Sequence, residues 1–378
     1  MQTSSLIDST PRLQYTLELL LAGMVDSNSN GSATSAFAKL RKLRRAWQEF
    51  RLSHQITLPC FHGRTPLACD YKVSAGVLGQ QVGQRGLKFH LLSSSPWGID
   101  AQEWDIEDLG FEVYHFVLDV AQDLLIATEL QTEAVDVIVG MRVHLLSLHT
   151  GKPHPHAQVP VFTVDYSDND GRIGVNAECC GDSLGVMVTT RFFDGICELL
   201  VWNWKTGQLR LDIYNMMYDA EPWLDKFIGA NSFHFLDADH VLVPTIEENK
   251  GINSRAVLHM FDCREISPAR KALRDLISCG TAFILPPLAQ NFEYTQFDCA
   301  ANIPPPLAPT SPFHPDPTLR MVVFQLGETV GSRCATSPTT QGLRHFACPR
   351  GQPQQVSRHG RPRGRARKRR LADSNYDL

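Results

Sequence analysis

Three stretches of the chain repeat one pattern, and this repeat limits the possible folds more than any other feature. Each stretch has a strand-like segment, a turn with an aspartate and then an apolar segment. The three stretches are HFVLDVAQDLLIATEL at 115–130, NAECCGDSLGVMVTTR at 176–191 and SFHFLDADHVLVPTIE at 232–247. A further apolar segment follows each of them, and the first two of these close on Thr-Gly, a plausible hairpin turn. The pattern therefore predicts a unit of several short strands that occurs three times.

The aspartates Asp123, Asp182 and Asp239 mark the same point of each unit, 59 and then 57 residues apart. A unit of this length cannot bury its own faces and must stack on copies of itself. Radial stacking gives a β-propeller, whose blades are four-stranded antiparallel sheets. We therefore predict a mainly β fold with β-propeller-like repeats over 56–330. The number of blades and the closure of the ring stay open, and a β-sandwich is the second candidate.

Two helices are predicted in the segment 1–55, before the strands, and one further helix is predicted over 268–278. The first follows a polar cap within residues 8–10, begins at Pro11 and ends at Gly23. Apolar residues recur along it at helical spacing, which predicts one buried face. The residues expected on that face are Leu13, Leu17, Leu20 and Leu21.

The second helix is predicted over 36–51, and it is basic and amphipathic. Its charged residues are expected to face water, because most such faces are merely solvated; contact with an acidic partner is the alternative. The apolar face is expected to hold Phe37, Leu40, Leu43, Trp47 and Phe50. The charged face is expected to hold Lys39, Arg41, Lys42, Arg44 and Arg45.

The C-terminal segment 331–378 differs in charge from the rest of the chain. It carries 11 basic and 2 acidic residues, a net charge of +9, whereas the whole chain has −4, so residues 1–330 carry −13. With scarcely any apolar pattern, this basic tail is predicted to be disordered. Its densest part could bind phosphates and nucleic acid nonspecifically or act as a nuclear import signal. The residues of this candidate site are Arg361, Arg363, Arg365, Arg367, Lys368, Arg369 and Arg370.

One hydrolase signature is present, GDSLG at 181–185, which also looks like the nucleophile block of GDSL-type esterases. Asp237 and His240 fit the Asp-x-x-His that such enzymes carry downstream. A nucleophile elbow needs a helix after its serine, but a β-branched segment, 186–190, follows Ser183. We therefore interpret GDSLG as a hairpin turn of the repeat.

Other residue groups suggest chemistry but lack the required pattern. Four histidines have no cysteine or carboxylate at ligand spacing, three aspartates at DYSDNDGR do not fit a calcium loop, and two adjacent cysteines lie within a predicted strand. We predict no catalytic residue, no metal, no cofactor and no enzyme. The groups are His144, His149, His154 and His156; Asp165, Asp168 and Asp170; and Cys179 and Cys180.

The ten cysteines are scattered, with no C-x-x-C pair, which indicates reduced thiols in a cytoplasmic or nuclear protein. No apolar run is long enough to span a bilayer, and the N-terminus lacks the pattern of a secretory signal. We therefore expect no membrane partner.

The sequence resembles fungal F-box proteins, particularly those of mushroom-forming fungi, in the region that follows the F-box. The likeness runs over about residues 5–326 and is specific as a set. It rests on LIDSTPRLQY at 6–15, with EL at 18–19 and AGMVD at 22–26; Trp47; VAQDLL at 120–125; LVWNWKTG at 200–207; and PFHP at 312–315, followed by 321–324.

The resemblance implies a non-enzymatic part of an adaptor that presents a substrate to a cullin-type ubiquitin ligase. The propeller's loop face would then select a protein substrate whose identity the sequence does not give. Family members carry an upstream F-box that begins with Leu-Pro, of which only the last residues, to about Tyr15, are expected here, so docking to the Skp-type linker is assigned to no residue.

At the other end, the family pattern predicts further strands after 322–324, where this sequence turns into the basic tail. A propeller without those strands would have an exposed edge. Two alternatives remain: a nucleic-acid- or chromatin-associated nuclear protein that acts through the tail, and a non-functional truncated gene product.

Overall fold

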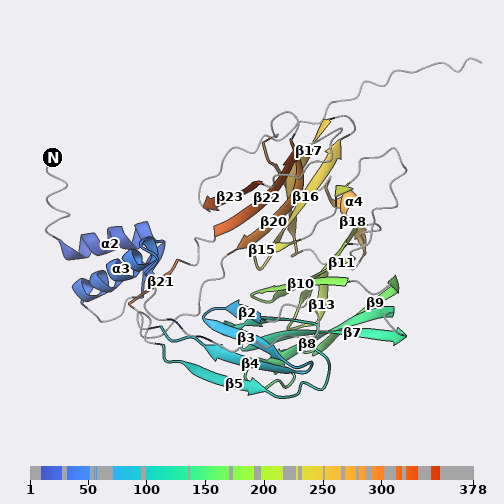
Figure 1. Cartoon of the computed structure of the whole chain (residues 1–378), viewed down its shortest axis with the longest axis horizontal. Coiled ribbons are helices and arrows are strands. Elements are labelled where there is room, and N and C mark those ends of the chain that lie inside the picture. The colour runs from blue at the N-terminus through green and yellow to red at the C-terminus, as the bar shows by residue number, and fades with distance from the viewer. Residues whose placement is uncertain are drawn as a thin grey trace, which may run out of the picture.

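The computed structural model contains a pair of helices and a series of antiparallel sheets (Figure 1). It describes residues 10–27, 32–51, 55, 57, 71–94, 99–134, 137–169, 173–190, 197–215, 227–228, 232–249, 252–264, 269–277, 281–286, 292–301, 312–316, 321–330 and 342–349. The basic cluster 361–370 and Asp170 lie outside the described residues, so their predicted roles stay predictions.

The two N-terminal helices, which we call the helix pair, lie beside a small two-stranded sheet. Gly23 ends the first helix in a left-handed conformation (φ 62°), as the predicted stop requires. Thr10 precedes the helix, but its side chain makes no capping hydrogen bond. The elements are α2 (Pro11–Ala22), β1 (Met24–Asp26), α3 (Ala33–Gln48) and β21 (Phe313–Pro315), which pairs antiparallel with β1. The helix predicted over 36–51 therefore begins and ends three residues earlier.

Five larger sheets follow, each built mainly from consecutive antiparallel strands. The first contains β2 (Tyr71–Ser74), β3 (Val77–Val82), β4 (Gly86–Leu91) and β5 (Gln102–Ile106). The second contains β6 (His115–Asp119), the short 3-10 helix η1 (Val120–Gln122), β7 (Leu124–Ala134), β8 (Val137–Ser147) and β9 (Val161–Asn169).

The third contains β10 (Ile173–Cys180), β11 (Ser183–Thr190), β12 (Cys197–Asn203), β13 (Gln208–Asn215) and, parallel to β13, β18 (Lys271–Ala272), which leads into α4 (Leu273–Ile277). The fourth contains β14 (Phe227–Ile228), β15 (His234–Asp237), β16 (His240–Asn249), β17 (Ile252–Asp262) and β19 (Thr281–Ile284). The fifth contains β20 (Phe292–Ala301), β22 (Met321–Val330) and β23 (Gly342–Pro349).

The predicted repeat is confirmed by equivalent backbone hydrogen bonds in the second, third and fourth sheets. In each, the backbone carbonyl of the turn aspartate accepts a hydrogen bond from the N–H of the residue that directly follows β8, β12 or β17. The three bonds are Leu148 N to Asp123 O at 2.8 Å, Trp204 N to Asp182 O at 3.0 Å, and Cys263 N to Asp239 O at 2.6 Å. The aspartates therefore mark the same corner of three successive sheets.

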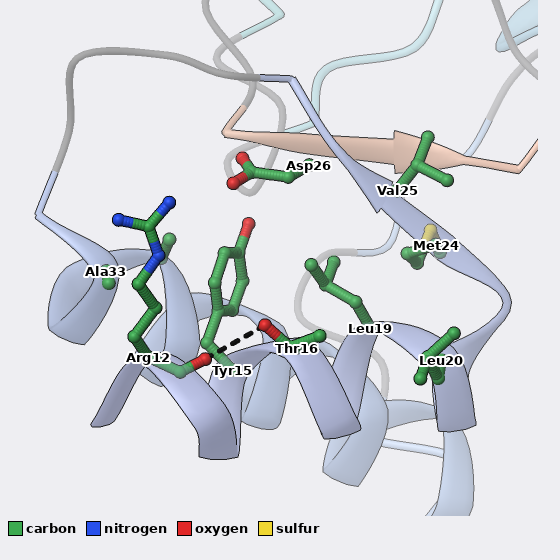
Figure 2. A pocket seen from close by; sticks show the side chains of 10 residues that line it. Arg12, Tyr15, Thr16, Leu19, Leu20, Met24, Val25, Asp26 and Ala33 are labelled. Carbon is green, nitrogen blue, oxygen red and sulfur yellow. Dashed lines mark hydrogen bonds between the residues drawn. The ribbon is translucent and has the colours of Figure 1, made fainter. Parts of the chain in front are cut away.

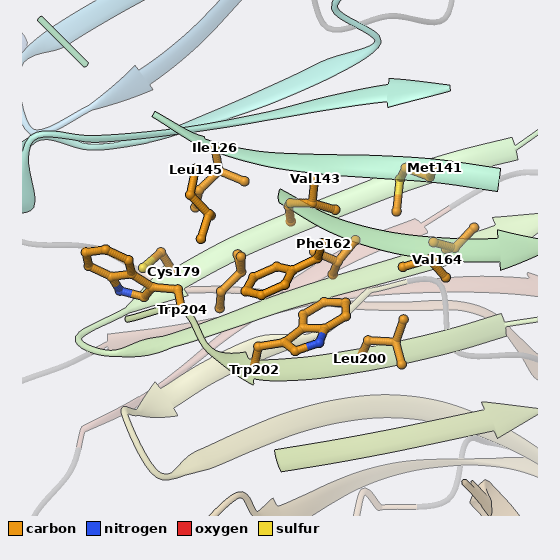
Figure 3. Close-up of a cluster of buried hydrophobic side chains, with 14 of the residues drawn as sticks. Ile126, Met141, Val143, Leu145, Phe162, Val164, Cys179, Leu200, Trp202 and Trp204 are labelled. Atoms are coloured by element: carbon orange, nitrogen blue, oxygen red, sulfur yellow. The ribbon is translucent and has the colours of Figure 1, made fainter. Parts of the chain in front are cut away.

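The sheets pack face to face in chain order, as propeller-like repeats do. Separate apolar cores join the first sheet to the second, the second to the third, the third to the fourth and the fourth to the fifth. Figure 3 shows the core between the second and third sheets, where the rings of Phe162 and Trp202 stack at 5.0 Å and Trp204 is fully buried. The first strands β2, β6, β10, β15 and β20 also contact one another in this order.

The fold is therefore mainly β with propeller-like repeats, rather than the two-sheet sandwich considered as the alternative. Within the described residues, no apolar core joins the fifth sheet to the first.

Two predicted boundaries need correction. The tail predicted to be disordered from residue 331 contains β23, whose backbone pairs with β22 from Met321 to Glu328. This pairing uses backbone groups, so the missing apolar pattern did not reveal it. The helix predicted over 268–278 begins later, at Leu273, because Lys271 and Ala272 pair with β13.

Candidate interaction surface

Ser183 of the GDSLG segment lies in the β10–β11 hairpin, and its side chain is buried. Its hydroxyl donates to the carbonyl of Ala238 at 2.5 Å and accepts from Nη1 of Arg210 at 2.8 Å. Strand β11 begins at Ser183 itself, so there is no helix to expose the hydroxyl. The hairpin interpretation is confirmed, and Ser183 connects the third sheet to the turn of the fourth.

The remaining parts of the apparent esterase signature are also structural. Nδ1 of His240 lies 2.8 Å from the carboxylate of Asp237, which also accepts from the His240 backbone N–H, so both close their own turn. At Gly185 a Cβ atom would lie 2.4 Å from the ring of Phe233. This glycine is therefore needed for close packing of the third sheet on the fourth.

The four histidines do not gather at one point: His144 and His149 contact different carboxylates, whereas His154 and His156 contact each other. His144 lies 3.0 Å from Glu129 and stacks on Phe111, and burial lowers its pKa. Nε2 of His154 lies 3.0 Å from the Gln122 carbonyl, and Nδ1 of His154 accepts from the His156 backbone N–H. Within the described residues, no three histidine, cysteine or carboxylate side chains form a group that could hold a metal ion.

Two of the aspartates and both cysteines singled out in the sequence lie in strands. Asp165 and Asp168 belong to β9. Cys179 faces the core between the second and third sheets, and Cys180 faces the core between the third and fourth. Burial raises the pKa of the Cys179 thiol well above its ordinary value, which opposes formation of a reactive thiolate.

The corners marked by the turn aspartates carry a second repeated feature that the sequence reasoning missed. A basic residue follows the third strand of each unit: His149 and Arg264 are exposed, and Lys205 is partly exposed. Nδ1 of His149 lies 2.5 Å from Asp123, and Nζ of Lys205 lies 2.6 Å from Asp182. Arg264 instead pairs with Asp262. The signal was available, because these three residues recur at spacings of 56 and 59.

We call these three basic residues, with their carboxylate partners, the turn edge. Burial alone would raise the pKa of Asp123, but hydrogen bonds from the His149 ring, the Ser147 hydroxyl and the His149 N–H outweigh it and lower that pKa. The turn edge therefore places a basic side chain beside a carboxylate at equivalent corners of three successive sheets.

The helix pair differs from its prediction in which face is buried. Tyr15 and Leu19 of α2 pack against Ala36 and Leu40 of α3 and against Phe313 of β21. Tyr15 also donates to the Pro312 carbonyl at 3.1 Å, and burial, with Asp26 nearby, raises the pKa of Tyr15 to about 12. The buried face of α2 is thus centred on Tyr15 and Leu19 because β21, from far along the chain, covers that side.

The residues predicted to be buried on α2 are exposed instead: Leu13 by 43%, Leu17 by 45%, Leu20 by 73% and Leu21 by 60%. On α3, Leu40 is buried and Phe37 and Leu43 are partly buried, as predicted, but Trp47 and Phe50 are exposed. A hollow of about 530 Å³ lies beside α2 (Figure 2). Its lining residues are Arg12, Tyr15, Thr16, Leu19, Leu20, Met24, Val25, Asp26, Ala33 and Ala36.

No described helix has the length and apolar character needed to cross a bilayer. No protein-family model matches the sequence, and no curated protein matches it either. Two solved structures of Hsv2 from Kluyveromyces lactis are similar to the chain. One is 14% identical, covers 69% of this chain and 68% of that one, and has a TM-score of 0.29. The other is 12% identical, covers 74% and 72%, and has a TM-score of 0.31. At these TM-scores the likeness adds nothing to the fold that the sheets themselves define.

Proposed function

We propose that the chain is a non-enzymatic protein-recognition module of the F-box adaptor type, which selects a substrate for a cullin-type ubiquitin ligase. The ligase part of the proposal rests on the sequence resemblance over about residues 5–326. The recognition part rests on the turn edge, which is the observation that carries it.

Three successive sheets share the same corner hydrogen bond yet present histidine, lysine and arginine from it. A scaffold that keeps its backbone and varies its exposed side chains suits recognition of another protein, because the side chains change without loss of the fold. The side chains of Ser183 and Cys179, which could in principle react, are in contrast buried between the sheets.

Site-specific photo-crosslinking tests this function. A photoreactive amino acid replaces Lys205 in the full chain, expressed in a mushroom-forming fungus, and a second version carries it at Thr163, which is exposed in the outer strand β9. We expect position 205, and not position 163, to capture a protein whose half-life lengthens when the chain is deleted. The proposal would be contradicted if every captured protein kept the same half-life after deletion of the chain.

The basic cluster 361–370 supports the second candidate, nucleic-acid binding, through its charge alone. Because β23 runs to Pro349, a deletion that tests it should begin after that residue. We expect removal of 351–378 to leave crosslinking at position 205 unchanged. Loss of a nucleic-acid complex together with loss of nuclear localisation would favour the second candidate.

A further inference from the structure

One face of α2 remains apolar and exposed after the helix has packed. Leu13, Leu17, Leu20 and Leu21 recur at helical spacing on the side opposite Tyr15 and Leu19. They cover about 12 Å along the helix axis. We call these four residues the leucine face.

The leucine face continues into the hollow through Leu20, which belongs to both. Figure 2 shows Leu20, Leu19 and Met24 on one side of this space, with the ring of Tyr15 on the other and Asp26 above it. A row of apolar side chains with a recess beside it is the kind of surface that takes one bulky apolar side chain and the apolar face of a helix.

The charges around the leucine face indicate the chemistry of what binds there. Arg12 is exposed on the hollow side of α2. On the other side, Glu18 is already paired with Arg44 of α3 at 2.6 Å. Arg41 lies one turn before Arg44 on α3, with its guanidinium over the ring of Phe37. Arginines therefore border the leucine face on both sides, which suits a partner with acidic residues beside its apolar ones.

Charge and shape disfavour two other occupants. In a two-fold contact with a second copy, the arginines beside one leucine face would come close to those beside the other. An anionic bilayer would also meet the arginines favourably, but a flat lipid surface would leave the hollow beside Leu20 unfilled, whereas a helix can insert a side chain there.

We propose that the leucine face and the adjoining hollow bind an acidic amphipathic helix of a partner protein. This surface lies on the helix pair and the turn edge lies on the sheets, so it goes beyond the recognition proposed above and can be tested separately.

The test measures binding of a designed peptide to the full chain by fluorescence anisotropy. The peptide is a 20-residue helix with leucines at i, i+4 and i+7 and glutamates beside them. We expect saturable binding, at least a tenfold loss of affinity in Leu17→Glu and in Leu20→Glu, and at least a tenfold weaker affinity for the same peptide with lysines in place of the glutamates. Lys42→Glu, an exposed change elsewhere on α3, is the control and should weaken binding less than twofold.

Equal affinity for the glutamate and lysine peptides, or unchanged binding by both leucine variants, would overturn the proposal. A dimer in sedimentation experiments that Leu20→Glu converts to a monomer would replace the partner helix with a second copy. Binding to phosphatidylserine vesicles that the same variant removes would replace it with a membrane. Circular dichroism confirms that the variants are folded. Crosslinking from position 205 should survive Leu20→Glu, so failure here leaves the proposed function intact.

Discussion

The sheets and the helix pair treat their leucines in opposite ways. Leu124 of β7 and Leu184 of β11 are fully buried in the core between the second and third sheets. Leu20 and Leu21 of α2 have the same side chain and a comparable amphipathic context, yet more than half of each remains exposed. The difference lies in the supply of neighbours rather than in the local sequence.

A repeated sheet finds its partner in the next copy along the chain, so an apolar face in one unit predicts an apolar face in the next. A helix outside the repeat has no neighbouring copy against which its apolar face can pack. α2 receives α3 and β21 on one side only. An amphipathic pattern that the fold does not use therefore points to a surface, and four predictions test this reading.

Truncation of a leucine should separate the two regions most strongly. Leu124→Ala leaves a cavity in a closed core and should lower the free energy of unfolding by about 2–5 kcal/mol. Leu20→Ala removes a side chain that is already in water and should change it by less than about 0.5 kcal/mol. Urea denaturation of the two variants measures both values. Equal costs would show that the leucine face is covered in solution.

Close packing between sheets gives the next largest effect. Gly185→Ala adds a methyl group that would meet the Phe233 ring, a buried side chain that cannot move away, and overpacking of this kind costs about 1–3 kcal/mol. Gly174→Ala in β10 of the same sheet is the matched control, because its added Cβ would meet the hydroxyl of Thr189 rather than a ring. In thermal unfolding, the Tm of Gly185→Ala should be lower than that of Gly174→Ala. A lower Tm for Gly174→Ala would contradict the tight contact between the third and fourth sheets.

Local chemistry explains what the sequence could predict. Pro11 marks the start of α2 and Gly23 its end, because each acts through its own backbone conformation. The turn aspartates revealed three sheets because the same corner occurs in each of them. The first sheet escaped detection because its hairpins turn at Gly76 and Gly83, without the aspartate. Its strands therefore look unlike the other units although they pack in the same way.

Long-range contacts explain what the sequence could not predict. Which face of α2 is buried depends on Phe313, almost 300 residues away, so helical spacing found an apolar face but chose the wrong one. The strand β23 forms by pairing with the edge of β22. The turn edge becomes visible only when the residues after the third strand are compared among the three units. In each case the deciding partner lies outside the segment that carries the pattern.

Acid should affect the sheets before the helix pair. Burial lowers the pKa of His115 to about 3 and of His259 to about 4, whereas an unfolded chain protonates histidine near pH 6.5. Both contribute stability that is present above pH 6.5 and is lost as the pH falls towards these lower values, by up to about 1.4 kcal/mol per pH unit for each. α2 and α3 contain no histidine. Hydrogen exchange between pH 6.5 and 4 should show the sheets losing protection first.

The variant His259→Gln sharpens this test. Gln can keep a hydrogen bond to Thr245, which lies 3.0 Å from Nε2 of His259, but it does not titrate. The slope of unfolding free energy against pH should fall by the contribution of one proton. An unchanged slope would mean that His259 is not held neutral in the folded protein.

The smallest effect is expected at the turn edge, where the ion pair of Lys205 and Asp182 is about half exposed. An exposed pair contributes only about 0–1 kcal/mol, so Lys205→Ala should lower stability slightly and the difference should shrink in high salt. The corner itself depends on the backbone bond from Trp204 to Asp182, which the substitution leaves in place. Lys205→Ala measured by urea denaturation at low and high salt tests this expectation. A loss above about 2 kcal/mol would show that the side chain holds the corner together, and the turn edge would then be part of the scaffold rather than a surface that is free to vary.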